Sequence, residues 1–149
     1  MKDLDFMAVS QRIKERFGEG AVAADDKRLI ICPERFADIA SFLRDDPDLA
    51  LDYLNSITGV DHKTHFTVVY HFTSMTKKHR LTLKIDLDDR ANPSLPSVTP
   101  IWRGADLQER EIFDLLGIEF KDHPNLKRIF LWDGFPGFPL RKDWVSRDA

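Results

Sequence analysis

The chain contains almost no cysteine, no long apolar run and no large excess of either charge. Its single thiol, Cys32, cannot form an intrachain disulfide or hold an iron–sulfur cluster, which normally needs several thiolates. We interpret Cys32 as a small buried apolar residue. The formal net charge of −3 provides no electrostatic footprint for nucleic acid, so we expect no nucleic-acid partner.

Segments that would carry the chain into or across a membrane are also missing. The N-terminus alternates charged and apolar residues and therefore has no signal-peptide apolar region. No uninterrupted apolar run approaches the roughly 20 residues that a membrane-spanning helix needs. We therefore expect a cytosolic protein without direct membrane insertion, which reaches a membrane only through other proteins.

Sequence motifs for nucleotide binding and nucleophilic catalysis are absent. The stretches FGEG and DGFPGFP lack the lysine and the spacing of phosphate-binding loops, and there is no nucleophilic serine elbow. His65 and His71 share a strand face but lie roughly 20 Å apart at strand spacing, too far for one metal ion. His71 and His79 are able to approach across a hairpin, yet the pattern offers no third ligand. We therefore predict no catalytic, cofactor-binding or metal site in this chain.

The first third of the chain combines helical periodicity with clear start and stop signals. Apolar residues recur at helical spacing, and glycine or proline separates the periodic segments. Asp46 followed by Pro47 has the form of a cap residue and a first helical residue. These signals predict a helix over residues 6–17, a hairpin over 21–32, a helix from Pro33 to Leu43 and a short helix from Asp46 to Leu54.

The middle of the chain has the alternating pattern of β-strands. From Leu81 to Leu87 every second residue is apolar, which indicates one covered face and one solvent-facing face. Residues 56–61 and 65–73 complete the predicted sheet, and residues 98–102 form a short strand or edge segment. Helices packed on one face of a small antiparallel sheet are the simplest arrangement of these elements, an α+β fold.

A further helix is predicted near the C-terminus. Asp106 and Glu109 have the spacing of a reciprocal capping box, and Gly117 suits the left-handed end of the helix. Arg110 and Asp114 lie one turn apart on another face of the helix and can pair. Two interpretations of Glu109 stay open. It is a capping acid near the positive end of the helix dipole, or a partly buried carboxylate that reaches a basic group on another chain.

The last twenty residues, 130–149, have no periodicity. Large apolar side chains alternate with proline and glycine, which excludes a regular helix or a central strand. Large exposed apolar patches mark interaction surfaces, and protein interfaces are rich in Trp, Phe and Arg. We therefore divide the chain into an α+β domain over residues 1–129 and an extended C-terminal interaction arm over residues 130–149.

Several motifs occur together in the second half of the chain. In order they are SVTPIW, EREIFDLLGIEF, HPNLKRI and GFPLRKD, preceded by LDYLNSITGVD and the paired strands. This combination closely resembles the C-type subunits, the 30 kDa subunit family, of the bacterial proton-pumping NADH:quinone oxidoreductase, respiratory complex I. The resemblance covers residues 46–144.

The resemblance implies a peripheral-arm subunit without a redox centre, on the cytoplasmic side of the cell membrane. Such a subunit binds beside the D-type, quinone-site subunit and near the cluster-bearing subunits. NADH, FMN, the iron–sulfur clusters and quinone would then belong to those neighbours. The resemblance also implies a partner interface formed by charged and aromatic residues of the motifs: Glu109, Arg110, Glu111, Asp114, His123, Arg128, Trp132, Phe135, Phe138, Arg141, Lys142 and Asp143.

Two other functions stay open at this point. Related subunits accompany membrane-bound hydrogenases, so the chain is alternatively the equivalent subunit of such a complex. The more remote alternative is a free-standing domain that binds a small molecule in a pocket lined by the aromatic residues of the arm, although such pockets usually contain a few convergent polar groups.

Overall fold

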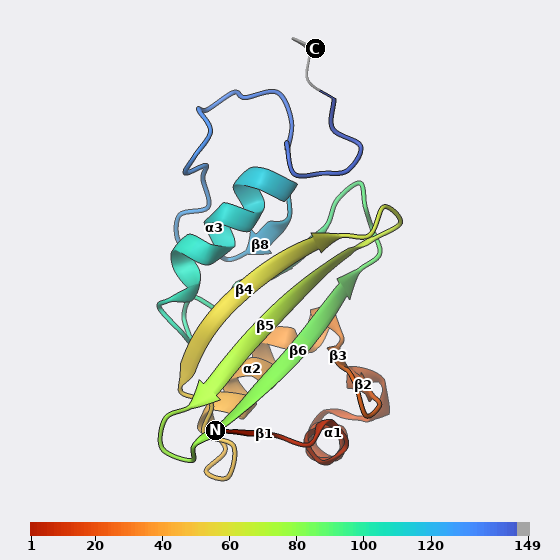
Figure 1. The fold of residues 1–149 in the computed structure, drawn as a ribbon, viewed down its shortest axis with the longest axis vertical. Coiled ribbons are helices and arrows are strands. Elements are labelled where there is room, and N and C mark those ends of the chain that lie inside the picture. The colour runs from red at the N-terminus through yellow and green to blue at the C-terminus, as the bar shows by residue number, and fades with distance from the viewer. Residues whose placement is uncertain (146–149) are drawn as a thin grey trace.

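The computed structural model describes residues 1–145, so the last four residues of the predicted arm lie outside the described part. The predicted helix over 6–17, the hairpin, the helix after Pro33, the three long strands and the C-terminal helix are all confirmed (Figure 1). The helices are α1 Phe6–Phe17, α2 Phe36–Asp45 and α3 Ala105–Leu116. The strands are β1 Lys2–Asp3, β2 Val22–Ala24, β3 Leu29–Ile31, β4 Tyr53–Asp61, β5 Phe66–Ser74, β6 His79–Leu87, β7 Ser94–Pro96 and β8 Glu119–Lys121.

The fold is α+β, as predicted, and its main sheet is mixed. Strands β4, β5 and β6 pair antiparallel, and the sheet order is β2-β3-β6-β5-β4. Both β1 and β3 lie parallel to β6, through the pairs Lys2–His79 and Ile30–Lys84. A separate parallel pair joins β7 to β8. The parallel strands β1 and β3 are only two or three residues long, too short to show periodicity in the sequence.

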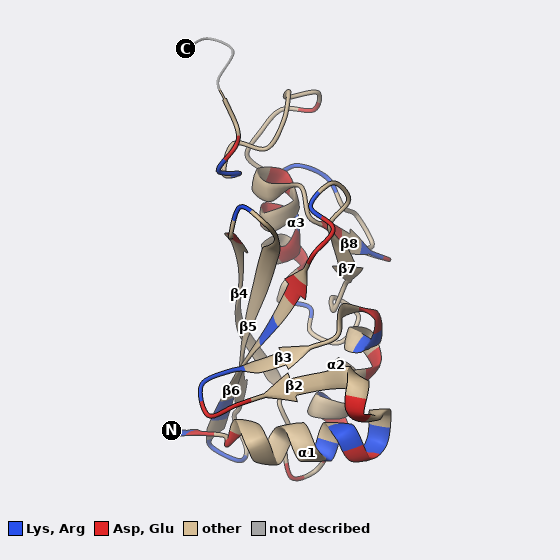
Figure 2. Cartoon of the chain, turned by 90° about the vertical axis from the view of Figure 1, so that its right-hand side faces the viewer, with Lys and Arg blue, Asp and Glu red and all other residues tan. Residues whose placement is uncertain are grey.

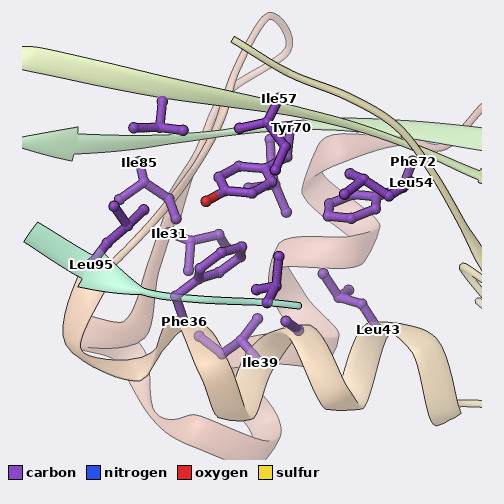
Figure 3. Packing of buried hydrophobic residues seen from close by; sticks show 14 of the residues in the cluster. Ile31, Phe36, Ile39, Leu43, Leu54, Ile57, Tyr70, Phe72, Ile85 and Leu95 are labelled. Carbon is purple, nitrogen blue, oxygen red and sulfur yellow. The ribbon is translucent and has the colours of Figure 1, made fainter. Parts of the chain in front are cut away.

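The core lies between one face of the sheet and the helices. The inward side chains of β5 are buried, and Tyr70 contacts Phe36 at the start of α2 with ring centroids 4.8 Å apart (Figure 3). The opposite face of β4, β5 and β6 has no helix in front of it (Figure 1). It carries cross-strand polar pairs, including Thr67 with Asp86 and His71 with Thr82. The alternation in the sequence therefore separates the covered face from the open face.

The predicted short helix from Asp46 to Leu54 is wrong. Asp46 does act as a cap, because its Oδ1 accepts the N–H groups of Asp48 and Leu49, but it caps a single turn. Ala50 has a positive φ of 45°, which ends the turn, and the chain enters β4 at Tyr53. Leu49, Leu51 and Leu54 are therefore buried from a turn and a strand instead of a helix, and Tyr53 is exposed.

Two smaller expectations also differ from the structure. The short strand is Ser94–Pro96, whereas residues 98–102 form a turn in which Val98 O accepts the N–H groups of Ile101 and Trp102. Because this connection contains several prolines, the sequence did not show which of its residues pair as a strand. Cys32 is half-buried, not buried, and its thiol donates a 2.7 Å hydrogen bond to Glu34 Oε2. That bond to a carboxylate raises the pKa of Cys32.

Candidate functional site: the fastened C-terminal arm

Helix α3 lies along β4, the outer strand of the sheet (Figure 1). Ile112 and Leu116 pack onto Gly59, where an added Cβ would lie 2.6 Å from Leu116 Cδ1. The side chain of Gln108 accepts the Ile57 N–H at 2.8 Å and so satisfies a donor on the outer edge of the strand. An edge strand without such cover exposes unpaired backbone groups. The helix therefore protects the sheet and carries the motif residues at its rim.

Glu109 is fully buried and is not the helix cap. The residue before the helix is Gly104, which makes no side-chain cap bond. The Glu109 carboxylate instead accepts hydrogen bonds from Ser97 Oγ at 2.6 Å, Val98 N at 2.9 Å and Thr99 Oγ1 at 2.7 Å. Burial raises the pKa of Glu109 in spite of these three donors. The carboxylate therefore holds the 97–99 turn against α3 and presents no surface to another chain.

The His123 side chain is also buried and lies beside this carboxylate. Its Nδ1 accepts the Asn125 N–H at 2.9 Å, so the imidazole proton is on Nε2 when the ring is neutral. Nε2 donates to Asp106 O at 3.2 Å and lies 2.9 Å from Asp106 Oδ1, off the hydrogen-bond direction. Glu109 Oε1 is 3.9 Å away. His123 thus ties the loop after β8 to the first turn of α3.

Asp114 collects three backbone N–H groups from the start of the arm. Its Oδ2 accepts from residues 129, 130 and 131 at 3.1, 2.7 and 3.2 Å, while Oδ1 lies 3.3 Å from Arg128 Nη1. Burial alone would raise the pKa of Asp114, but the donated N–H groups and Arg128 outweigh burial and lower it. Arg110 and Asp114 do not form the pair that their spacing allows, because Arg110 donates to the carbonyl oxygens of Lys127 and Arg128.

Arg128 joins α3 to the far part of the arm. Besides contacting Asp114, its guanidinium donates through Nη2 to Phe135 O at 3.3 Å and to Gly137 O at 2.9 Å. The same group also lies over the ring of Phe138, 4.9 Å from the centroid. Five donors in a rigid plane suit arginine to this multiple contact. We call Asp114, Arg128 and the backbone groups that they bind the arm clamp.

A second attachment holds the end of the arm to the sheet. Asp61, at the end of β4, forms a bidentate pair with Arg90 at 2.6 and 2.9 Å and accepts the Lys142 N–H at 2.8 Å. Arg90 Nη2 also lies 3.4 Å from Asp143. The Arg90 contact and the donated N–H groups hold the pKa of Asp61 well below its usual range, against the effect of burial. Neither Asp61 nor Arg90 was predicted as a site residue. Arg90 follows Asp61 by 29 positions and Lys142 follows it by 81, and no local sequence pattern links residues so far apart.

Arg141 closes the C-terminal end of α3. Its Nε donates to Leu116 O at 2.6 Å, and its guanidinium lies 5.0 Å from the Phe138 ring centroid and 5.1 Å from that of Phe66. Burial and the neighbouring Arg90 lower the pKa of Arg141. A cation that binds the last carbonyl groups of a helix also complements the negative end of its dipole. Gly117 ends the helix in the predicted left-handed conformation, with φ 75°.

The arm therefore turns its anchoring groups inward and several large apolar side chains outward. Phe130 and Trp132 are each 65% exposed, and Leu140 is 59% exposed. Phe135 and Phe138 are half-buried, and Phe135 contacts Trp132 edge-on at 5.8 Å. Of the twelve residues predicted for a partner interface, the exposed ones are Glu111, Trp132, Lys142 and Asp143. Half-buried or buried in their own chain are Glu109, Arg110, Asp114, His123, Arg128, Phe135, Phe138 and Arg141.

The histidines and the hollows of the described residues bear on whether the chain has a ligand site. No group of three or more His, Cys, Asp or Glu side chains within residues 1–145 is placed to hold a metal ion. A hollow of about 840 Å³ lies on the open sheet face near Met75, and two pairs of its polar side chains bond each other, His71 with Thr82 and Thr73 with Asn55. His79 bonds Leu49 O instead of approaching His71. Across the same residues, none of the helices is long and apolar enough to span a bilayer.

Fold and site together define a small α+β protein that fastens an irregular C-terminal arm to its last helix and to the end of β4, by backbone hydrogen bonds to Asp114, Arg128 and Asp61. The comparisons identify its family. A family model described as "Respiratory-chain NADH dehydrogenase, 30 Kd subunit" matches residues 29–149. The chain belongs to this family, as the motifs of its second half predicted.

Relatives that are named as C-type subunits of NADH-quinone oxidoreductase align over most of the chain. The one from Roseiflexus sp. (strain RS-1) is 41% identical, with 94% of this chain and 84% of that protein covered. The second of the C-type subunits of Rhizobium etli (strain CIAT 652) is also 41% identical, over 91% of this chain and 75% of that protein. The relative from Roseiflexus castenholzii is 46% identical over 79% of this chain and 69% of its own length.

A solved structure shares the fold. A chain of the membrane-bound sulfane sulfur reductase, described as an archaeal respiratory membrane complex, superposes with a TM-score of 0.72. The match covers 95% of this chain and 86% of the other, at 19% sequence identity. Similarity at this identity extends to the fold alone.

Proposed function

We propose that this chain is a non-redox scaffold subunit in the peripheral arm of a proton-translocating NADH:quinone oxidoreductase. It docks against the quinone-site subunit and supports electron transfer from NADH to quinone without carrying electrons itself. The observation that carries the proposal is the arm, whose anchoring charges are used internally while Phe130 and Trp132 face outward. The relatives named as C-type subunits of this enzyme supply the identity of the complex.

The physical case for docking is the cost of leaving large apolar side chains in water. Contiguous exposed apolar patches generally mark interaction surfaces, and Trp and Phe are enriched at interface centres. Phe130, Trp132 and Leu140 all belong to the arm and are all more than half exposed. A neighbouring subunit that covers them gains apolar burial at little cost in ordering the arm, because the arm clamp already fixes its backbone.

The single cysteine of the chain supports a scaffold role. One cysteine cannot provide the thiolates of an iron–sulfur cluster. NADH, FMN, the clusters and quinone therefore belong to neighbouring subunits in this proposal, and the chain lies on the cytoplasmic side of the membrane through the complex. Its contribution is to hold the electron carriers of its neighbours in register.

The test is to replace the exposed aromatic residues in the complete complex. In a Phe130→Ala/Trp132→Ala variant we expect less of the cluster-bearing and quinone-site subunits to co-purify, and NADH:quinone activity to fall with the amount of assembled complex. Met75→Ala, which changes another exposed apolar residue in the β5–β6 turn, is the control. Full assembly and unchanged activity in the double variant would count against the proposal.

The proteins that co-purify also separate the alternatives. A D-type quinone-site partner supports the NADH:quinone oxidoreductase. A large subunit with a set of nickel-binding cysteines would instead assign the chain to a membrane-bound hydrogenase. A chain that purifies alone, tightly bound to a small molecule, would favour the free-standing ligand-binding domain.

A further inference from the structure

Between β4 and α3 lies a narrow apolar groove that ends at the arm. Ile57 and Gly59 of β4 form one side, and Ile112 and Leu115 of α3 form the other. Leu140 closes one end, because its N–H donates to Leu115 O at 3.0 Å and brings the arm over the last turn of the helix. The side-by-side course of α3 and β4 below the arm is visible in Figure 1. We call this hollow the α3–β4 groove.

The volume of the α3–β4 groove is suited to one or two protein side chains. Its volume is about 220 Å³, whereas small-molecule sites usually measure about 300–1,000 Å³. The groove is shaped by the missing side chain of Gly59, against which Leu116 and Ile112 pack. One or two apolar side chains of a protein segment would fill it.

A single unpaired charge stands at the rim of the groove. Glu111 is exposed and forms no ion pair or hydrogen bond through its carboxylate within residues 1–145. The other three acidic residues of α3 each have a cation or hydrogen-bond donor nearby: Asp106 has His123, Glu109 has the 97–99 turn and Asp114 has Arg128. The acidic positions of the helix are visible in Figure 2. Glu111 is therefore the acidic side chain of α3 that is free to pair with a cation from outside the chain.

We propose that the α3–β4 groove receives an apolar segment of the neighbouring subunit that places one Lys or Arg side chain against Glu111. This inference rests on the proposed function, because it assigns to the same partner a second contact beside the arm. The apolar residues of the segment fill the hollow between Gly59 and Leu115, and its cation pairs with the carboxylate at the rim. Leu140 belongs both to the arm and to the groove, so the two contacts form one continuous interface.

The experiment reverses the charge at the rim and, separately, fills the groove. Glu111→Lys places two cations face to face, and Leu115→Trp adds bulk to the wall. Glu119→Lys makes the same charge change at an exposed position on β8, outside the groove, and is the matched control. Each purified chain is titrated onto the separately purified quinone-site subunit, at low and high salt, after its melting temperature has been measured.

We expect Glu111→Lys to bind at least about 30-fold more weakly than the wild type, since like charges at an interface cost several kcal/mol. Leu115→Trp should also bind more weakly, and Glu119→Lys should bind normally. Glu111→Gln should bind more weakly than wild type with a smaller dependence on salt. Melting temperatures close to that of the wild type exclude loss of fold as the cause.

Three outcomes would overturn the inference. If only the Phe130/Trp132 variant binds weakly, the arm docks as proposed but the groove is not part of the interface. If neither that variant nor the groove variants lose affinity, both this inference and the proposed function fail. In the third outcome, the isolated chain forms a dimer. If Glu111→Lys abolishes this self-association and leaves binding to the neighbouring subunit unchanged, the groove receives a second copy of the chain.

Discussion

Asp114 and Arg128 meet at the C-terminal end of α3, where Arg128 Nη1 lies 3.1 Å from the Asp114 carbonyl oxygen and 3.3 Å from its Oδ1. The aspartate gathers the backbone N–H groups at the start of the arm, and the arginine gathers the carbonyl oxygens further along. Two side chains of opposite charge thus satisfy the backbone of an irregular segment that has no ladder or helix of its own.

Removing the carboxylate of the arm clamp should destabilise the whole domain. In Asp114→Ala, Arg128 loses its buried counter-charge and three N–H groups lose their acceptor. We expect the free energy of unfolding to fall by about 3 kcal/mol, as for other broken buried pairs. Chemical denaturation measures this change. Asp133→Ala, which removes an exposed acid in the arm, is the control, and equal stability of the two variants would contradict the role of the clamp.

Replacing Arg128 by lysine should loosen the arm and spare the core. Lysine keeps the charge but cannot reach Asp114, Phe135 O and Gly137 O at once, because it lacks the planar set of donors. We expect amide hydrogen exchange in residues 130–145 to become at least about tenfold faster, while exchange in β5 is unchanged. Equal exchange in the arm of both proteins would show that Arg128 is dispensable for its conformation.

Two glycines flank α3 and should respond in opposite ways to alanine. Gly117 has φ 75°, and an added Cβ would lie 2.6 Å from the Phe138 ring and 2.7 Å from Arg141 Nη2. Gly104 has φ −61° and open space around it. We expect Gly117→Ala to cost about 2 kcal/mol or more of stability and Gly104→Ala to be neutral or slightly stabilising. Thermal unfolding compares the pair, and a similar loss in both would rule out this explanation.

Acid should weaken the second attachment through Asp61. A carboxylate whose pKa is lowered by folding adds stability that is present in full above its unfolded pKa, about 3.9, and is lost as the pH falls toward its folded pKa. Because Arg90 and the donated N–H groups lower the pKa of Asp61, we expect this carboxylate alone to account for a drop in the free energy of unfolding on the order of 2 kcal/mol between pH 6 and pH 2. The pKa of Asp114 is also lowered, so Asp61→Asn should remove only the share of Asp61, as denaturation of both proteins across the range will show.

Glu109 should act in the opposite direction at higher pH. Its pKa is raised by burial, so its contribution to stability is present below the unfolded pKa and is lost as the pH rises through the folded pKa. A Glu109→Gln variant separates the two effects, because it keeps an acceptor for the 97–99 turn without the charge. The free energy of unfolding of both proteins is measured as the pH rises, and we expect the loss to be smaller in the variant. If both proteins lose the same stability, the titration of Glu109 is not the cause.

The long periodic elements could be predicted from the sequence, because burial of one face imposes a regular spacing. The helix over 6–17, the alternation from Leu81 to Leu87 and the left-handed Gly117 all follow from such local rules. The helix predicted after Asp46 failed because a cap residue also suits a single turn. Short strands such as β1 form only because β6 offers an edge to pair with, and no local signal marks them.

The partner interface drawn from the motifs of α3 and residues 130–143 stays a prediction. Charge patterning could not distinguish a contact within the chain from one with a partner. Glu109 and Asp114 were predicted as interface acids, whereas both are buried and bound by distant segments of the same chain. Only the folded structure brings Asp61 to Lys142.

The bond between Asp61 and Lys142 spans 81 residues, and it depends on Arg90 as well. Contacts this far apart in the chain form late, since the intervening strands must first be in place. The arm therefore acquires its shape only on a completed domain. A chain in which β4 and Arg90 are not yet in place therefore lacks the second attachment of the arm.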